Sequence, residues 1–334
     1  MTESSSQTTE NSSSPSELSP LNIPSLTRAD HRFLTHIRRN IEAKAYDRLG
    51  YTEDEKVILK KTIVQDIEME AAVSPQERGL YTPQLMNYAE ELISKLELTD
   101  LTTPEDTLSD TIIVDKDSYY QLVKTHGLYE PGRGRMFFID EEGTRNRKIV
   151  LTNELCQGKE WPPEQTKYTF QHELAHALSD PDCPVGLQEA GAQYYSMRFQ
   201  SPQSTQKLSR LSRSFSQELD SKIGYKIPLQ IYENLVSIVG EKEMQNLFFR
   251  GNMQAIDNLK PEKVRDIVYA CLSRMNEAHQ CHYSVAKQQG VNRGFLDNIN
   301  QEAKNNVLRG MQAYAITEAY ALSLLASQSL PAIK

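Results

Sequence analysis

One change of hydrophobic period in an otherwise helical chain constrains the fold most. Apolar residues recur at helical spacing from Thr27 to Leu98, and from Thr205 onward only helical patterns follow. Between them, TIIVDKD, MFFID and KIVLT are rich in β-branched and aromatic residues, which favour strands. The sequence therefore predicts an α+β chain that is mostly helical, with one small β-sheet in its middle.

The chain of 334 residues is long enough for one large or two modest domains. Its first residues are nearly all Ser, Thr, Glu, Gln, Asn and Pro, and such a segment cannot bury enough apolar surface to fold. A helix is expected near Pro83 to Leu96, and MFFID and KIVLT should form a hairpin around a glycine-containing turn. We predict a disordered tail, an N-terminal helical region, a core with the strands and a helical C-terminal subdomain, over residues 1–26, 27–105, 106–202 and 203–334.

Charge and cysteine usage exclude several classes of function. The formal charge is −8 with acids and bases mixed along the chain, so no nucleic-acid partner is expected. Four cysteines without a CxxC pair favour a reducing compartment. The N-terminus has no apolar signal region and no apolar run could span a bilayer. We expect a cytoplasmic protein, or one exported without a cleaved signal.

The stretch QHELAHALSD carries the chemistry. In a helix, His172 and His176 lie one turn apart on the same face, where both imidazoles can reach one tetrahedral zinc ion. Glu173 lies beside His172, from where its carboxylate can act as general base on a water at the metal. The opposite side of the helix is apolar, so the helix should be buried. Its polar groups then need partners, and a metal would supply them.

A catalytic zinc needs a third protein ligand and an open position. Glu189 on the next predicted helix is the natural candidate, because a short turn would fold the two helices back against each other. Asp180, Asp182 and Cys183 in that turn are rivals. Asp beside Pro more often shapes a turn, and a cysteine ligand would favour a structural site.

HELAH followed by PVGLQEAGAQYY resembles the gluzincin zinc metallopeptidases, in which a helix close to P-x-W-L-x-E-G-x-A-x-Y carries the third ligand. The likeness covers roughly residues 135–255. Gly186 and Ala190 stand where the family usually has Trp and Gly. The matching positions are Pro184, Leu187, Glu189, Ala192 and Tyr194.

This resemblance implies a zincin-like catalytic core over 106–202, with a small sheet, an active-site helix and a helical C-terminal subdomain. It implies one Zn²⁺ bound by His172, His176 and Glu189, a peptide or protein substrate, and KIVLTN as the edge strand along which the substrate lies. Gln193 occupies the place of an acid that often partners a zinc histidine. A Tyr or His of the C-terminal helices should stabilise the oxyanion, and the candidates are Tyr269, His279, His282 and Tyr283.

Three alternatives stay open. Glu189, Ala192, Gln193, Tyr195 and Pro202 also fit the helix of the ImmA/IrrE-type regulatory proteases, although Gly191 replaces a second Glu. The protein could instead be a zinc-binding but catalytically inactive helical interaction module. Finally, the motif could be accidental in a helical scaffold. HQCHYS could hold a second metal, although a polar helix face explains it more simply.

Overall fold

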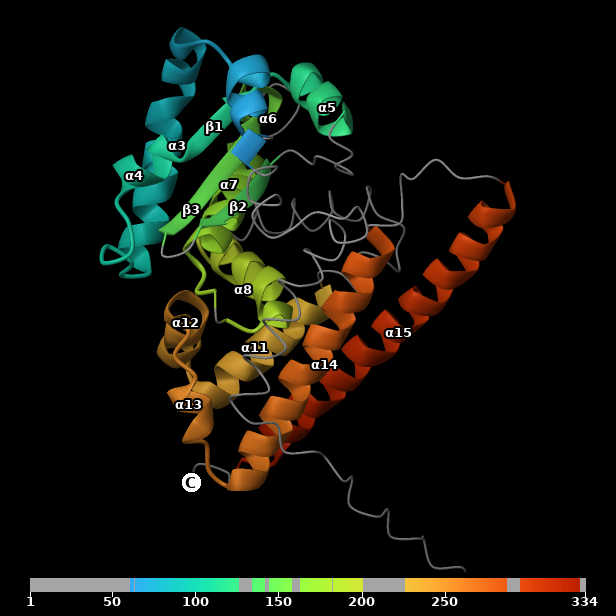
Figure 1. Cartoon of the computed structure of the whole chain (residues 1–334). Helices are drawn as coiled ribbons and strands as arrows, with labels where there is room; N and C mark the ends of the chain where they lie inside the picture. The colour runs from blue at the N-terminus through green and yellow to red at the C-terminus, as the bar shows by residue number, and fades with distance from the viewer. Residues whose placement is uncertain are drawn as a thin grey trace, which may run out of the picture.

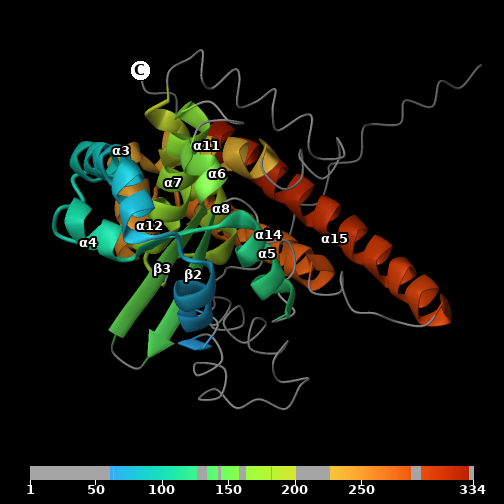
Figure 2. The ribbon, with the colours of Figure 1, turned by 90° about the horizontal axis from the view of Figure 1, so that it is seen from above.

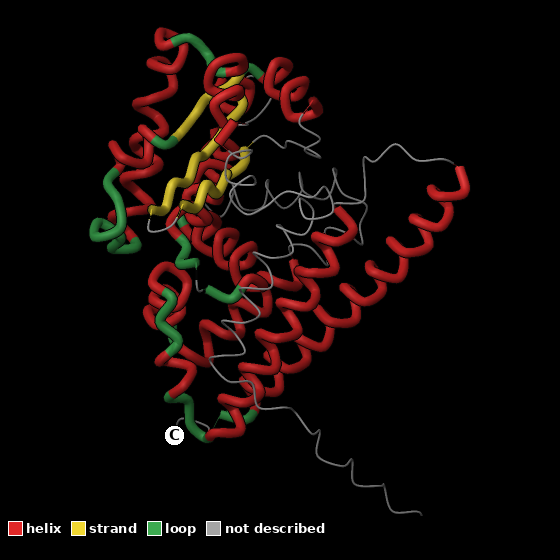
Figure 3. Tube along the Cα trace, viewed as in Figure 1, coloured by secondary structure: helices red, strands yellow, loops and turns green. Residues whose placement is uncertain are grey.

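A three-stranded sheet lies among helices in the computed structural model of the chain (Figures 1 and 3). The structure describes residues 61–62, 64–125, 134–141, 144–157, 163–181, 183–200, 226–286 and 295–330. The expectation of a mostly helical α+β chain is confirmed. The predicted tail, and the predicted helical region as far as residue 60, lie outside the described residues.

The sheet has the order β1-β3-β2, with strands β1 (Thr111–Val114), β2 (Gly134–Glu141) and β3 (Thr144–Thr152). β2 and β3 form the predicted antiparallel hairpin, and β1 pairs with β3 in parallel. The expectation that KIVLTN is an edge strand was wrong, because β3 lies in the centre. Ile149, Val150 and Leu151 are all buried, as in a strand covered on both faces. The edge strand of the hairpin is β2.

The two faces of the sheet bury separate clusters, because neighbouring strand residues point to opposite faces. Ile112, Val114 and Val150 pack with residues of η1 (Ile67–Ala71) and α5 (Lys116–Thr125). On the other face, residues of β1 and β3 join the main core with the helices that carry the predicted site. One face of the sheet therefore packs against the helices that carry the predicted site.

Helix α3 (Pro75–Lys95) begins earlier than the predicted start near Pro83, which lies inside the helix. Ser74 caps its first turn, since the Ser74 hydroxyl accepts the Glu77 amide at 3.2 Å, and Pro75 follows at the first position. Its apolar residues Leu85, Ala89 and Leu92 share one buried face. Two short helices, α4 (Pro104–Ser109) and α6 (Asn153–Gln157), flank the strands.

The C-terminal part is helical, as the sequence predicts. It comprises α11 (Ile227–Val239), α12 (Glu241–Arg250), α13 (Gln254–Asp257), α14 (Glu262–Ala286) and α15 (Phe295–Gln328). Helices α14 and α15 lie side by side and extend away from the sheet in both views (Figures 1 and 2). Among the described residues, no helix has the length and apolar character that crossing a membrane requires.

Candidate metal centre

Two helices carry the predicted site. α7 (Pro163–Leu178) begins at Pro163, and α8 (Val185–Arg198) packs against it after a short turn. Phe170 and Leu174 of α7 are buried in the core. That apolar side holds α7 on the sheet and leaves the histidine side facing α8.

The structure brings His172, His176 and Glu189 together. The two Nε2 atoms are 3.2 Å apart, and each lies 3.5 Å from a different oxygen of the Glu189 carboxylate. Ligands at about 2.0–2.1 Å from a tetrahedral zinc ion are separated by about 3.3 Å. Among the described residues, this is the only His, Cys, Asp and Glu group arranged to hold a metal ion.

One side of this group is open. The side chains of His172 and His176 are 12% and 9% exposed, whereas that of Glu189 is 38% exposed. The histidines are thus largely buried, while part of the Glu189 side chain reaches solvent. A bound ion would keep a position for water or substrate, which a catalytic site requires and a closed structural site lacks.

The charges within the group are coupled. Burial alone would raise the pKa of the Glu189 carboxyl, but the charges and hydrogen bonds of the two histidines hold it well below its usual range. Burial lowers the pKa of His172, yet the hydrogen bond and charge of Glu189, with that of Glu173, raise it on balance. The group therefore favours a negative carboxylate facing a cation.

Glu173 lies on α7 beside the edge strand. A Cβ atom placed on Gly134 of β2 would lie 3.3 Å from Glu173 Cγ and 2.8 Å from Thr169 Cγ2. Only a glycine lets the strand approach α7 so closely without a shift of these side chains. The ring of Tyr168, one turn before His172, lies 5.8 Å from the His172 ring. The predicted base thus follows His172 on α7 and lies against β2.

The predicted outer partner, Gln193, lies on α8 one turn after Glu189 and, within the described part of the chain, forms no hydrogen bond to a histidine. Its Nε2 contacts Met197 Sδ at 3.7 Å. Its Oε1 and His172 Nδ1 are both buried without a hydrogen-bond partner among the described residues. The acceptor and the donor of the predicted contact are therefore both available.

The rival ligands lie elsewhere. Asp180 faces the end of α12, where its Oδ1 would be 2.6 Å from a Cβ on Gly251. Cys183 is buried, and its Sγ lies 3.7 Å from the Pro184 carbonyl oxygen. Neither belongs to the metal group, and Asp182 lies outside the described residues.

Of the oxyanion candidates, Tyr269 lies on α14. Its hydroxyl donates to Asp257 at α13, and its side chain is buried there, because the core captures this face of α14. His279 is half-buried on α14, one turn after Asn276, which contacts α8. The side chains of His282 and Tyr283 lie outside the described part of the chain.

Two residues that support the ligand helices were missed. Arg147 of β3 donates to main-chain carbonyls at the end of α7. Asn276 of α14 accepts the Gly186 amide at the start of α8. The sequence carries little signal for either, since each contact joins segments far apart in the chain.

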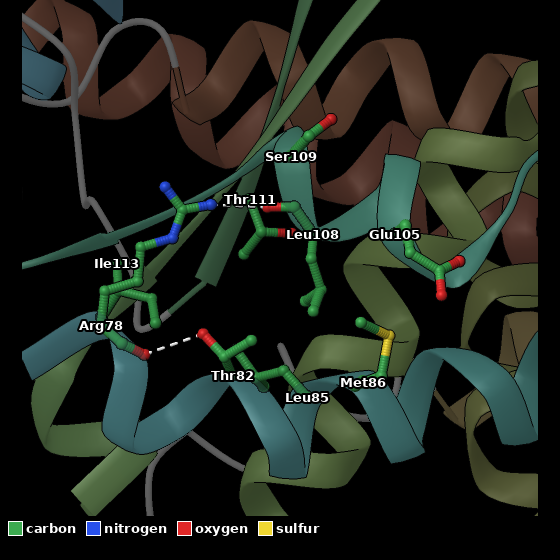
Figure 4. Close-up of a pocket in the computed structure, with 9 residues that line it drawn as sticks. All are labelled: Arg78, Thr82, Leu85, Met86, Glu105, Leu108, Ser109, Thr111 and Ile113. Carbon is green, nitrogen blue, oxygen red and sulfur yellow. Dashed lines mark hydrogen bonds between the residues drawn. The ribbon is translucent and has the colours of Figure 1, made fainter. Parts of the chain in front are cut away.

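A cavity of about 220 Å³ lies between α3, α4 and β1, away from the metal group (Figure 4). Its lining includes Leu85, Met86, Leu108 and Ile113, and none of the three ligands. The guanidinium of Arg78 donates to the Leu108 carbonyl at 2.8 Å. Arg78 thereby ties α3 to α4 across the cavity.

No family model, curated protein or solved structure matches the chain. The gluzincin resemblance therefore stays an expectation from the motif. The geometry of the three side chains carries the functional argument.

Proposed function

We propose that the protein is a zinc-dependent metallopeptidase with a zincin-like core. His172, His176 and Glu189 hold one Zn²⁺, and Glu173 is the general base. The observation that carries this proposal is the mutual spacing of 3.2 and 3.5 Å between the three ligand side chains. Two imidazoles and one carboxylate are also the ligand set of several catalytic zinc sites.

The surroundings favour a catalytic site over a structural one. The exposed side of Glu189 leaves room for a fourth ligand. Glu173 is not one of the three ligands, but it follows the ligand His172 directly in the sequence and lies on the same helix, α7. A carboxylate that is close to a metal without binding it is the arrangement expected of a base.

The residues divide the chemistry between them. When bound, zinc acts as a Lewis acid that lowers the pKa of water and polarises a carbonyl. Glu173 accepts the proton of the attacking water and passes it to the leaving amine. His172 and His176, on a buried helix, and Glu189, on its neighbour, keep the site in place. His279 on α14 is our remaining described candidate for stabilising the oxyanion.

We propose that the substrate peptide binds along the edge strand β2. The gluzincin resemblance implies a substrate extended along an edge strand, and β2 has that place within the described sheet. Gly134 of β2 lies against Glu173. An added strand would pair with β2 through main-chain hydrogen bonds and bring a peptide carbonyl beside the base.

The test combines metal analysis with a proteolysis assay on quenched fluorescent peptides. We expect one zinc per chain in the wild type and in Glu173→Gln, and little in Glu189→Ala. Glu173→Gln should lose activity by about 10²–10⁴-fold. Glu164→Gln, in the first turn of the same helix, is the matched control and should behave like wild type.

Two outcomes contradict the proposal. A purified wild type without stoichiometric zinc, after incubation with the ion, would remove the metal centre. Equal peptide cleavage by wild type and Glu173→Gln, or no cleavage by either, would favour a zinc-binding interaction module.

A further inference from the structure

A side chain from the sheet holds the C-terminal end of α7. Arg147 of the central strand β3 is buried, with only 7% of its surface exposed. Its Nη1 donates to the carbonyl oxygens of His176 at 3.1 Å and Ser179 at 2.8 Å, and also to that of Ala177. One guanidinium nitrogen thus contacts three main-chain carbonyl oxygens.

These carbonyls need a partner. The last four carbonyls of a helix have no partner inside the helix, and glycine in a left-handed conformation often ends it. In α7 the residue after the last helical residue, Leu178, is Ser179 and not a glycine. The Ser179 amide and hydroxyl return to the His176 carbonyl at 3.2 and 2.8 Å. The cation of Arg147 adds charge complementary to the negative end of the helix dipole.

The contact reaches the metal group directly through the backbone. His176 lies in the last turn of α7, where helices fray most easily, yet it must supply a ligand in a fixed position. Its carbonyl accepts three hydrogen bonds, from Arg147, the Ser179 amide and the Ser179 hydroxyl. A helix end secured at the ligand residue itself keeps the Nε2 atom directed at Glu189.

We propose that Arg147 is a positioning residue of the metal centre, which sets the backbone of His176 for zinc binding. This inference rests on the proposed zinc site. Arg147 acts through the main-chain carbonyl of His176 and is not one of the three proposed ligands. Its role is to keep the last turn of α7 closed when the ion binds.

The experiment measures zinc affinity by competition with a chromophoric chelator, and the absorption of the Co²⁺-loaded protein. Arg147→Met should weaken zinc binding by about tenfold, as for other residues that orient ligands. It should also alter the Co²⁺ bands. Arg147→Lys should recover most of the affinity, because all three bonds come from one nitrogen and an ammonium has three donors.

Lys148→Met is the matched control. Lys148 is the next residue of β3, but its ammonium pairs with Asp110 at 2.8 Å instead of contacting α7. We expect wild-type zinc affinity from it. Melting curves of the metal-free proteins, recorded in parallel, separate loss of folding from loss of affinity.

The results distinguish the two proposals. A folded Arg147→Met protein with wild-type zinc affinity overturns the positioning role while leaving the zinc site intact. If Arg147→Met does not fold, Ser179→Ala decides, because it removes one hydrogen bond from the same carbonyl. Unchanged zinc affinity in a folded Ser179→Ala protein would then overturn the role, because zinc binding would not depend on the bonds to the His176 carbonyl. A wild type that binds no zinc overturns the proposed function and this inference together.

Discussion

Gly186 and Asn276 are joined by a hydrogen bond across 90 positions of the chain. The Gly186 amide donates to Asn276 Oδ1 at 2.8 Å, at the start of the helix that carries Glu189. A Cβ atom on Gly186 would lie 2.5 Å from Met275 Cβ and 2.8 Å from the Asn276 amide nitrogen. The C-terminal helix α14 therefore fixes the first turn of the ligand helix.

Gly186→Ala should destabilise the protein and weaken zinc binding. The added methyl meets the backbone of α14, which cannot move aside as a flexible side chain would. Such overpacking costs about 1–3 kcal/mol. Urea denaturation measures the free energy of unfolding, and the chelator competition measures zinc affinity.

Gly79→Ala is the control for Gly186→Ala. Gly79 lies in α3, and a Cβ there meets nothing within 4 Å. Because alanine favours helices over glycine by about 0.5–1 kcal/mol, this variant should gain stability. Equal effects at the two positions would contradict the close approach of α8 and α14.

Gly134→Ala should reduce peptidase activity without removing zinc. The new Cβ would lie 2.8 Å from Thr169 Cγ2 and 3.3 Å from Glu173 Cγ, so the base must shift. Misplacing a reacting group by about 1 Å can cost about 10²-fold in rate. Activity on the fluorescent peptides and zinc content are measured together. Adding Thr169→Ala removes the nearest contact and should restore part of the activity, whereas equal losses in the two variants would contradict this reading.

Zinc should stabilise the wild type by an amount that rises with the logarithm of its free concentration above the Kd. An ion that binds only the folded state adds about 2.7 kcal/mol at 100 times its Kd. Differential scanning calorimetry should show a rising Tm with added zinc and a fall with chelator. Glu189→Gln should abolish most of the rise, and Glu173→Gln should keep it. A zinc-dependent rise that survives in Glu189→Gln would place the ion elsewhere.

Stability should fall in acid partly through Glu91 of α3. Its carboxylate pairs with Lys167 of α7 at 2.5 Å and with Lys95 at 2.7 Å. Burial raises the pKa of Glu91, but hydrogen bonds from Lys167 and Lys95 lower it below 4.5 on balance. The stabilisation is therefore present above pH 4.5 and is lost as the pH falls through the lower, folded-state pKa.

Glu91→Gln should cost about 1 kcal/mol at pH 7, as for a partly exposed ion pair. The difference from wild type should shrink in denaturation experiments as the pH falls through the folded-state pKa of Glu91. Glu90→Gln, at the exposed neighbouring position, should change little at either pH. A difference between wild type and Glu91→Gln that persists at low pH would point to packing instead of charge.

Local sequence patterns predicted the helices and strands well. They predicted poorly which strands pair with each other. The β2–β3 hairpin and the start of α7 at Pro163 follow from strand residues, a turn and a proline. The parallel pairing of β1 with β3 joins distant segments and has no local signal. It makes β3 the central strand and moves the edge to β2, although the unbroken apolar run of Ile149, Val150 and Leu151 was a sign of this.

In the site, too, residues close together in the sequence could be predicted, and residues brought together by packing could not. His172, His176 and Glu189 could be predicted because they share one helix and its neighbour across a short turn. Arg147 and Asn276 could not, since a lone arginine in a strand and a lone asparagine in a helix are ordinary residues until packing places them at helix ends. The helix pattern also did not indicate that the Tyr269 side chain is buried with its hydroxyl bonded to Asp257.

All three proposed ligands lie between His172 and Glu189, on consecutive helices of the described chain. The chain entropy lost when an ion closes so short a loop is small, since that cost grows with loop length. An unfolded chain could therefore chelate zinc with part of the affinity of the native one, and the ion would stabilise the fold by less than its native affinity implies. On a growing chain, the ion could join α7 to α8 before α14 has been synthesised.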